Sequence, residues 1–389
     1  MKNGFSDRLE KLDNYVFSKT SQSKISRSNL EPIDLSLGNP DEPPDKEIIQ
    51  TMIEQARVSE NHRHPIYRGL VELKEKIAQW FFKRFKVKLN PETEILILAG
   101  SKQGLGLVGL TFLNKGDVAL VPNPAYPVYR RSVLLAEGKP LDMPLLKENG
   151  WLPDLDRLRN ISSKTKIVFI NYPNNPTGAI SNLDFLERLV DFALKNDLVI
   201  ISDMAYSEIV FDKLKAHSIL EVDGAKQRVL ELFSFSKSFS MAGWRMGFVV
   251  GNERLIDALQ KIRVTLDSGV FHLLQKGAIT ALAHSQKTRK ICQVYQRRRD
   301  LFVDGLQNCR WEIEKPKGTM FIWAKIPFDC SSAQMGSILE KEAGIIATPG
   351  AGLGSRGEGY IRFSLTANEI KLKQAIKRLK QLRIGSKKR

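Results

Sequence analysis

A single lysine at the end of an apolar run is the residue of this sequence best suited to covalent chemistry. Lys237 follows the strand-like run 229–235, and a second apolar run, 246–250, comes soon after it. A lysine at a strand end can be held by a packed scaffold, and a buried lysine loses its charge readily and becomes an amine nucleophile towards carbonyls. The position therefore predicts amine chemistry at Lys237, although a lone lysine beside serines is more often an ordinary surface residue.

Two other apolar runs that predict buried strands also lead into polar side chains. Asn175 lies in the turn of KIVFINYPNNPTG (166–178), Asp203 ends the run that begins at residue 198, and Tyr206 comes one helical turn later. Taken alone, NNPTG could be only a turn and Asp203 only a helix cap. Open α/β sheets bind ligands at strand ends, so these side chains are candidates for one common site.

The segment 95–103 combines a strand, a tight turn and the start of a helix. ILILAG is followed by Ser101, Lys102 and Gln103, and then by the apolar helical pattern GLGLVGLTFL. Free backbone N–H groups and the positive end of the helix dipole make such a helix start an anion site. We therefore expect Ser101, Lys102 and Gln103 to bind a phosphate through backbone and side-chain groups.

The sequence around Lys237 resembles the pyridoxal-phosphate attachment signature of the class I and II aminotransferases. That signature is SxSK followed, eight residues after the lysine, by the arginine of a GWR element. Its residues here are Ser234, Ser236, Lys237, Gly243, Trp244 and Arg245. Asn175, Asp203 and Tyr206 precede it in the family's order and spacing, and the resemblance covers nearly the whole chain.

The resemblance implies a role for each of these side chains. Lys237 would bind pyridoxal 5'-phosphate covalently and move the proton of the substrate α-carbon, while Asp203 would pair with the pyridine nitrogen and keep the ring cationic. Asn175 and Tyr206 would contact the phenolic oxygen, and Tyr126 would stack on the ring. The implied phosphate ligands are Ser101, Lys102, Gln103, Ser234, Ser236 and Arg245.

Further residues are implied contacts of the substrate or of a neighbouring subunit. Gly38 and Asn175 would lie at the substrate, and Arg362 in IRFSLT would grip its α-carboxylate, because a guanidinium can pair with a carboxylate through two hydrogen bonds. Where the family usually has a tyrosine that reaches the neighbour's phosphate, this sequence has His64, with Tyr67 three residues later. Both stay candidates. Candidates for the substrate side-chain pocket are Tyr15, Phe17, Lys102 and Arg356.

Composition and charge exclude several classes of protein. The 389 residues are 42 % hydrophobic and 26 % charged, which is typical of a globular protein with room for two cores, and no apolar run predicts a membrane span. The N-terminal segment does not resemble a secretory signal. Cys292, Cys309 and Cys330 lack CxxC spacing and predict isolated thiols of a reducing compartment, with no metal site.

The net charge of +17 raises the question of a nucleic-acid partner. The basic residues are spread along the chain, and the two densest runs, 286–300 and 371–389, contain apolar residues at helical spacing. We therefore expect solvated helix faces and a frayed tail rather than a nucleic-acid surface.

Alternation of strands and helices between residues 95 and 251 predicts a mostly parallel sheet covered by helices. The resemblance implies the fold-type-I architecture of pyridoxal-phosphate-dependent transferases. A large α/β domain with a mostly parallel seven-stranded sheet would span 47–270. A smaller α+β domain and an N-terminal arm would comprise 1–46 and 271–389.

The implied activity is transfer of an amino group from an L-amino acid to a 2-oxo acid by a ping-pong mechanism, with 2-oxoglutarate and glutamate as one expected pair. The stretch 243–282 is most similar to the alanine, aspartate and LL-diaminopimelate aminotransferase branch, whose members are homodimers with shared active sites. A lyase or decarboxylase on the same fold is the alternative. The donor amino acid stays open, and we expect a cytoplasmic enzyme.

Overall fold

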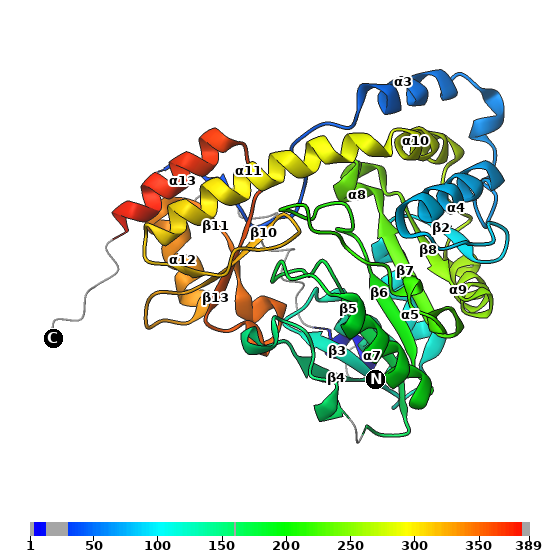
Figure 1. Ribbon diagram of the computed structural model, residues 1–389, viewed down its shortest axis with the longest axis horizontal. Coiled ribbons are helices and arrows are strands. Elements are labelled where there is room, and N and C mark those ends of the chain that lie inside the picture. The colour runs from blue at the N-terminus through cyan, green and yellow to red at the C-terminus, as the bar shows by residue number, and fades with distance from the viewer. Residues whose placement is uncertain (1–3, 13–29, 159–160, 383–389) are drawn as a thin grey trace.

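The structure is a computed structural model that describes residues 4–12, 30–158 and 161–382. It contains a seven-stranded sheet and a four-stranded sheet, and the long helix α11 (Thr288–Gln307) runs from one towards the other (Figure 1). The predicted α/β fold with a mostly parallel seven-stranded sheet is confirmed. The strands of that sheet lie within the range 47–270 predicted for the large domain, and the boundary itself stays a prediction.

The seven-stranded sheet has the order β2-β8-β7-β6-β5-β3-β4. Its strands are β2 (Ile95–Leu98), β3 (Val118–Asn123), β4 (Lys139–Pro144), β5 (Thr165–Asn171), β6 (Val199–Asp203), β7 (Val229–Ser234) and β8 (Gly247–Gly251). Neighbours from β7 to β4 pair in parallel, whereas β8 runs antiparallel to both β7 and β2. Strand β2 therefore points the same way as β7, and the parallel strands all end at the edge where β8 begins.

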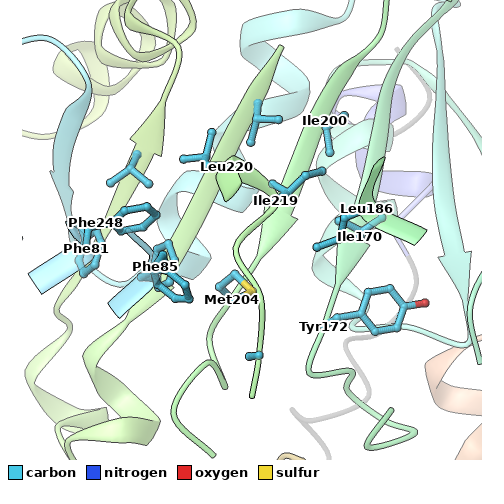
Figure 2. Close-up of a cluster of buried hydrophobic side chains, with 14 of the residues drawn as sticks. Phe81, Phe85, Ile170, Tyr172, Leu186, Ile200, Met204, Ile219, Leu220 and Phe248 are labelled. Carbon is cyan, nitrogen blue, oxygen red and sulfur yellow. The ribbon is translucent and has the colours of Figure 1, made fainter. Parts of the chain in front are cut away.

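Helices cover both faces of this sheet because successive strand side chains point to opposite sides. In β2, Ile95 and Ile97 belong to one core cluster, and Leu96 and Leu98 belong to the other. The first cluster includes side chains of α4 (Val71–Phe85), α7 (Leu183–Lys195) and α10 (His272–Ala283). The second includes α5 (Ser101–Phe112), α6 (Val128–Leu135) and α9 (Glu253–Leu266). Figure 2 shows part of the first cluster, with Phe81 of α4 and Leu186 of α7.

The four-stranded sheet is antiparallel, in the order β12-β13-β10-β9. Its strands are β9 (Glu312–Ile313), β10 (Phe321–Lys325), β12 (Thr348–Pro349) and β13 (Tyr360–Ser364). Helices α11, α12 (Ser332–Ala343) and α13 (Glu369–Gln381) share its core. Close by, β1 (Ile33–Asp34) pairs in parallel with β11 (Ile345–Ile346), so segments from both ends of the chain meet in this unit.

Further helices precede the seven-stranded sheet in the chain. They include the short α1 (Asp7–Glu10) and α3 (Lys46–Gln55), which comes before α4. Lys237 lies in the four-residue helix α8 (Phe235–Ser238) directly after β7. Among the residues that the structure describes, no helix combines the length and the apolar character needed to cross a membrane.

A buried carboxylate ties together the strands that lead to Lys237 and Asp203. Glu231 of β7 is fully buried and accepts hydrogen bonds from Ser202 Oγ at 3.0 Å, from Ile219 N at 3.2 Å and from the Ser218 hydroxyl. Burial raises the pKa of Glu231 to about 7, and the three donors lower it in part. Because Ser202 directly precedes Asp203, this carboxylate fixes β6 against β7 close to the ends of both strands.

Glu231 gives the free energy of unfolding a pH dependence of known sign. The folded protein binds more protons than the unfolded chain between the ordinary pKa of 4.5 and about 7, so stability falls as the pH rises through that window. In wild type, Glu231 should lower the free energy of unfolding by about 3 kcal/mol as the pH rises through this window, and Glu231→Gln should abolish that contribution. Urea unfolding of both proteins at about pH 5 and about pH 8 measures it. Ser202→Ala keeps the carboxylate and should keep the fall, and a fall of equal size with Glu231→Gln would contradict the expectation.

Candidate active site

A cavity of about 450 Å³ lies at the edge of the seven-stranded sheet where the parallel strands end. Its walls come from the segments after these strands, from residues 37–39 and from β10 and β13 of the four-stranded sheet. The predicted site residues on its walls are Gly38, Ser101, Lys102, Tyr126, Asn175, Asp203, Tyr206, Ser234, Ser236, Lys237, Arg245 and Arg362. Residues spread over more than 300 positions of the chain thus meet around one space.

Lys237 lines this cavity from the four-residue helix α8. The Ser234 side chain caps α8 by accepting from Ser236 N at 3.2 Å, and Lys237 Nζ donates to the carbonyl oxygen of Gly38. Burial, and then the positive charges of Arg245 and Arg362, lower the pKa of Lys237 to about 8. A substantial fraction of the amine is therefore neutral slightly above neutral pH, as a nucleophile or a proton acceptor must be.

Asp203 is the carboxylate of the cavity wall, and two donors hold it. Burial raises its pKa to about 6, while the hydrogen bonds from Tyr129 Oη at 2.8 Å and Ala205 N at 3.1 Å lower that pKa in part. The pKa of Tyr129 is well above its ordinary value because the phenol is buried beside Asp203, so Tyr129 is a donor at neutral pH. Asp203 is therefore mostly ionised near pH 7 and can hold a cationic ring nitrogen.

Arg362 is fully buried and faces the cavity from β13. Its guanidinium donates to Asn175 Oδ1 at 2.9 Å and to the Ser36 carbonyl at 2.6 Å, and it lies 4.1 Å above the centre of the Phe321 ring. Asn175 Oδ1 accepts a hydrogen bond from Arg362, so the Asn175 Nδ2 group is the donor of that amide. A planar guanidinium held in this way can present two parallel N–H groups to a carboxylate.

Another group of lining residues forms a corner suited to an anion. Ser101 opens the helix α5, and Ser236 and Arg245 also line the cavity. Gly100 has a φ of 84°, and a Cβ atom added there would lie 2.6 Å from an Arg245 guanidinium nitrogen. Only glycine leaves that space open. Hydroxyls, a helix N-terminus and a guanidinium are the donor set that a phosphate group requires, so this corner fits the phosphate of pyridoxal 5'-phosphate.

Several predicted residues lie elsewhere. The Gln103 side chain is not on the cavity wall, because its Oε1 accepts from Ala99 N at 2.8 Å and its Nε2 donates to Asp267. The amide holds the turn before α5 and therefore does not point at an anion. Arg356 is exposed and does not line the cavity. Tyr15 and Phe17 lie outside the described residues.

Among the lining residues that the sequence interpretation missed, three have side chains that shape the site. Tyr129 comes three residues after Tyr126, and one-turn spacing could have suggested that both face the site. Asn171 ends β5 and donates to the carbonyl of Asp203 at 2.7 Å. Phe321 lines the cavity from β10, and no local pattern distinguishes it from a core residue. Within the described part of the chain, no group of His, Cys, Asp or Glu side chains could hold a metal ion.

Tyr129→Phe should raise the pKa of Asp203 above about 6, by about one pH unit, because a hydrogen bond to the ionised carboxylate is lost. The ring should stay in place, since it stacks on Phe169 at 5.4 Å. Carbon-13 NMR of labelled aspartate carboxyls measures the titration, and Asp203→Asn assigns the signal. Tyr172→Phe is the matched control, since this buried hydroxyl donates to the Trp151 carbonyl and not to Asp203. Equal titrations in wild type and Tyr129→Phe would refute the role of Tyr129.

Comparison with known proteins agrees with this geometry. The sequence matches the family Aminotransferase class I and II over residues 31–379. An LL-diaminopimelate aminotransferase of Dehalococcoides mccartyi (strain CBDB1) is 45 % identical over 379 residues, covering 96 % of this chain and 97 % of that protein. A second one, from Aquifex aeolicus (strain VF5), is 41 % identical and covers 98 % and 99 %.

Solved structures give the same result. The substrate-bound structure of BacF from Bacillus subtilis has a TM-score of 0.93 at 36 % identity and covers 99 % of both chains. An aromatic aminotransferase from Pyrococcus horikoshii OT3 has a TM-score of 0.89 at 31 % identity, covering 97 % of this chain and 98 % of that one. The chain therefore belongs to the class I and II aminotransferases and is a pyridoxal-phosphate-dependent transaminase of fold type I.

Proposed function

We propose that this transaminase takes LL-diaminopimelate as its amino donor and 2-oxoglutarate as its acceptor. The observation that carries the proposal is the charge of the cavity wall, where the cationic side chains outnumber the carboxylates among the described residues. The cations are Lys102, Lys237, Arg245 and Arg362, and the carboxylate is Asp203. Both substrates carry two carboxylates, and the relatives at 41–45 % identity are named for the proposed donor.

Three of the cations have separate tasks in this proposal. Arg362 holds the α-carboxylate, Arg245 holds the cofactor phosphate with Ser101, Ser234 and Ser236, and Lys102 meets the second carboxylate of the substrate. A bidentate arginine suits the fixed α-carboxylate, whereas the flexible lysine at the start of α5 suits a carboxylate whose position differs between two substrates.

The chain's own residues then orient the substrate and move its proton. Bound pyridoxal 5'-phosphate supplies the electron sink for the charge left when the α-proton departs. Asp203 keeps the ring nitrogen protonated, and Asn175 and Tyr206 contact the phenolic oxygen. Lys237 Nζ, with its pKa near 8, accepts the α-proton and holds it for return, and the same atom anchors the cofactor between turnovers.

A donor screen tests the proposal directly. The purified enzyme with added cofactor should form glutamate from 2-oxoglutarate with LL-diaminopimelate at a kcat/KM at least about tenfold above that with alanine, aspartate or an aromatic amino acid.

We expect Lys102→Met to raise the KM for 2-oxoglutarate about tenfold while the KM for pyruvate, which has one carboxylate, stays within about twofold. Equal changes in KM for both acceptors would overturn the role of Lys102. In the donor screen, a higher kcat/KM with another amino acid would overturn the assignment of the donor.

A homodimer with shared active sites belongs to the same proposal. Apolar side chains of the loop before α4, of the last residue of α9 and of the turn that follows are exposed in the single chain: Ile66 51 %, Tyr67 55 %, Leu266 63 % and Phe271 39 %. Contiguous exposed apolar side chains mark protein interfaces. Asp267 in that turn binds Gln103, so this surface adjoins the helix start that lines the cavity. His64 and Tyr67 are exposed there and could each reach a partner's phosphate.

Leu266→Asp tests the dimer. We expect the variant to sediment as a monomer and to lose most of its activity, because a carboxylate would be buried in the interface. Ile370→Asp, on the exposed face of α13 at 78 % exposure, is the control and should leave the assembly intact. A Leu266→Asp enzyme that sediments like the wild type would contradict the proposed interface.

A cytoplasmic location is the last part of the proposal. It is supported by the three cysteines, Cys292, Cys309 and Cys330, which are free thiols in the structure. Free thiols are common in compartments where glutathione and thioredoxin keep cysteines reduced.

A further inference from the structure

Residues 36–42, which we name the strap, cross the wall of the cavity beside the four-stranded sheet. Leu37, Gly38 and Asn39 of the strap line the cavity. At Gly38 the strap lies directly on the Phe321 ring, because a Cβ atom added there would lie 2.6 Å from Phe321 Cζ. The same ring lies under the Arg362 guanidinium, so any displacement of the strap would disturb the predicted carboxylate site.

Main-chain hydrogen bonds do not hold the strap. Within the described residues, the main-chain groups of 37–42 make no hydrogen bond with any other main-chain group. Pro40 has no N–H to donate. Polar main-chain groups of a packed segment still require partners, so side chains must hold the strap.

Three successive strap carbonyls accept hydrogen bonds from side chains of the surrounding elements. The bonds are Arg362 to Ser36 O at 2.6 Å, Thr348 to Ser36 O at 3.0 Å, Thr366 to Leu37 O at 2.8 Å, and Lys237 to Gly38 O. Two of these donors, Lys237 and Arg362, are the groups that the cofactor and the substrate carboxylate would engage. Both ligands would therefore compete with the strap for these two donors.

The far end of the strap has an anchor that contacts neither ligand. Arg298 of α11 is 3 % exposed and pairs with Asp41 through two bonds, Nη1 to Oδ1 at 2.6 Å and Nη2 to Oδ2 at 2.9 Å. It also donates to Glu42 at 3.2 Å and to the Leu365 carbonyl at 3.1 Å. The guanidinium is buried, whereas the Asp41 side chain is 30 % exposed. Bidentate pairing fixes the geometry of the contact, and filling the cavity removes none of its bonds.

We propose that Arg298 is a positioning residue for the transaminase, which holds the strap over the filled cavity through Asp41. In the empty protein Lys237 and Arg362 share this task. After the cofactor and the substrate engage those two side chains, the Arg298–Asp41 pair keeps Gly38 and Asn39 against the bound molecules. The inference rests on the transaminase activity and is independent of which amino acid is the donor.

The chain contains a matched control one residue along the same helix. Arg299 is fully buried and also pairs through two bonds with an aspartate, Nη1 to Asp212 Oδ2 at 2.6 Å and Nη2 to Asp212 Oδ1 at 2.7 Å. It donates to the Pro316 carbonyl at 3.1 Å as well. Neither Arg299 nor Asp212 lines the cavity or contacts the strap, so this pair has the same kind of chemistry without the proposed role.

Asp41→Asn and Asp212→Asn in the cofactor-loaded enzyme separate the role of the strap from the loss of an ion pair to a buried arginine. We expect Asp41→Asn to release the cofactor about tenfold faster than wild type, measured as decay of cofactor absorbance after dilution into an excess of a cofactor-binding trap protein. Its KM for 2-oxoglutarate should rise about tenfold, with kcat within about threefold. Asp212→Asn should stay within about twofold of wild type in all three quantities.

Thermal unfolding of both variants controls for stability, since each loses the carboxylate charge that pairs with a buried arginine. If Asp41→Asn does not fold, Arg298→Lys, which keeps the positive charge and loses the bidentate geometry, is measured in its place, with Arg299→Lys as its control. The proposal would be overturned if Asp41→Asn and Asp212→Asn, or Arg298→Lys and Arg299→Lys, released the cofactor at equal rates. Cofactor release needs no substrate, so this result does not depend on whether the donor is LL-diaminopimelate.

Discussion

Burial of an amine between two guanidinium groups is the constraint on which the rest of the site depends. Lys237, Arg245 and Arg362 share one cavity, and their mutual repulsion, added to burial, favours the neutral amine that transamination requires. Such a cluster folds only if acceptors surround it. The structure supplies the carbonyls of Gly38, Ala242 and Ser36 and the amide oxygen of Asn175. The carboxylate of Asp203 adds an ionised group near neutral pH.

The direction of one strand brings the lysine and the phosphate arginine together. β7 ends just before Lys237, and β8 begins just after Arg245. Because β8 runs antiparallel to β7, its start lies at the edge where β7 ends. A parallel β8 would need a crossover and would place the residues before it at the opposite edge. The eight-residue spacing from Lys237 to Arg245 lies within the short connection, residues 235–246 with α8 and a 3₁₀ turn, that closes this antiparallel pair.

The functional residues that could be predicted from the sequence are those that lie at the ends of predicted strands. Lys237, Asp203 and Asn175 each follow an apolar run, and the resemblance gave them roles; the seven-stranded sheet came from the same resemblance. Phe321 and the Arg298–Asp41 pair could not be found in this way. They reach the site through contacts between distant parts of the chain, and a buried arginine on a basic helix looks like any solvated one in sequence.

The side chain of Gln103 lies elsewhere than its position in the sequence indicates. Its place at a helix start predicted an anion ligand, but a helix start offers an anion its backbone N–H groups, and a side chain there can equally turn back to support the preceding loop. The amide accepts from Ala99 N and thereby stabilises the turn that contains Gly100. Its contribution to the anion corner is indirect, through the shape of the turn, which no motif of residue types encodes.

The strap explains how a cavity of this charge can exist before any ligand enters it. Lys237 and Arg362 each donate to a strap carbonyl, so no bare cation is left in a buried space, where desolvation would be costly. Ligand binding then exchanges one acceptor for another instead of adding bonds to unsatisfied donors. An exchange of this kind yields less net affinity than new bonds would, and weaker ground-state binding favours an enzyme that must release one substrate before it takes the next. The arrangement works only if the strap stays in place after losing two of its donors, which requires a third contact that the ligands do not touch.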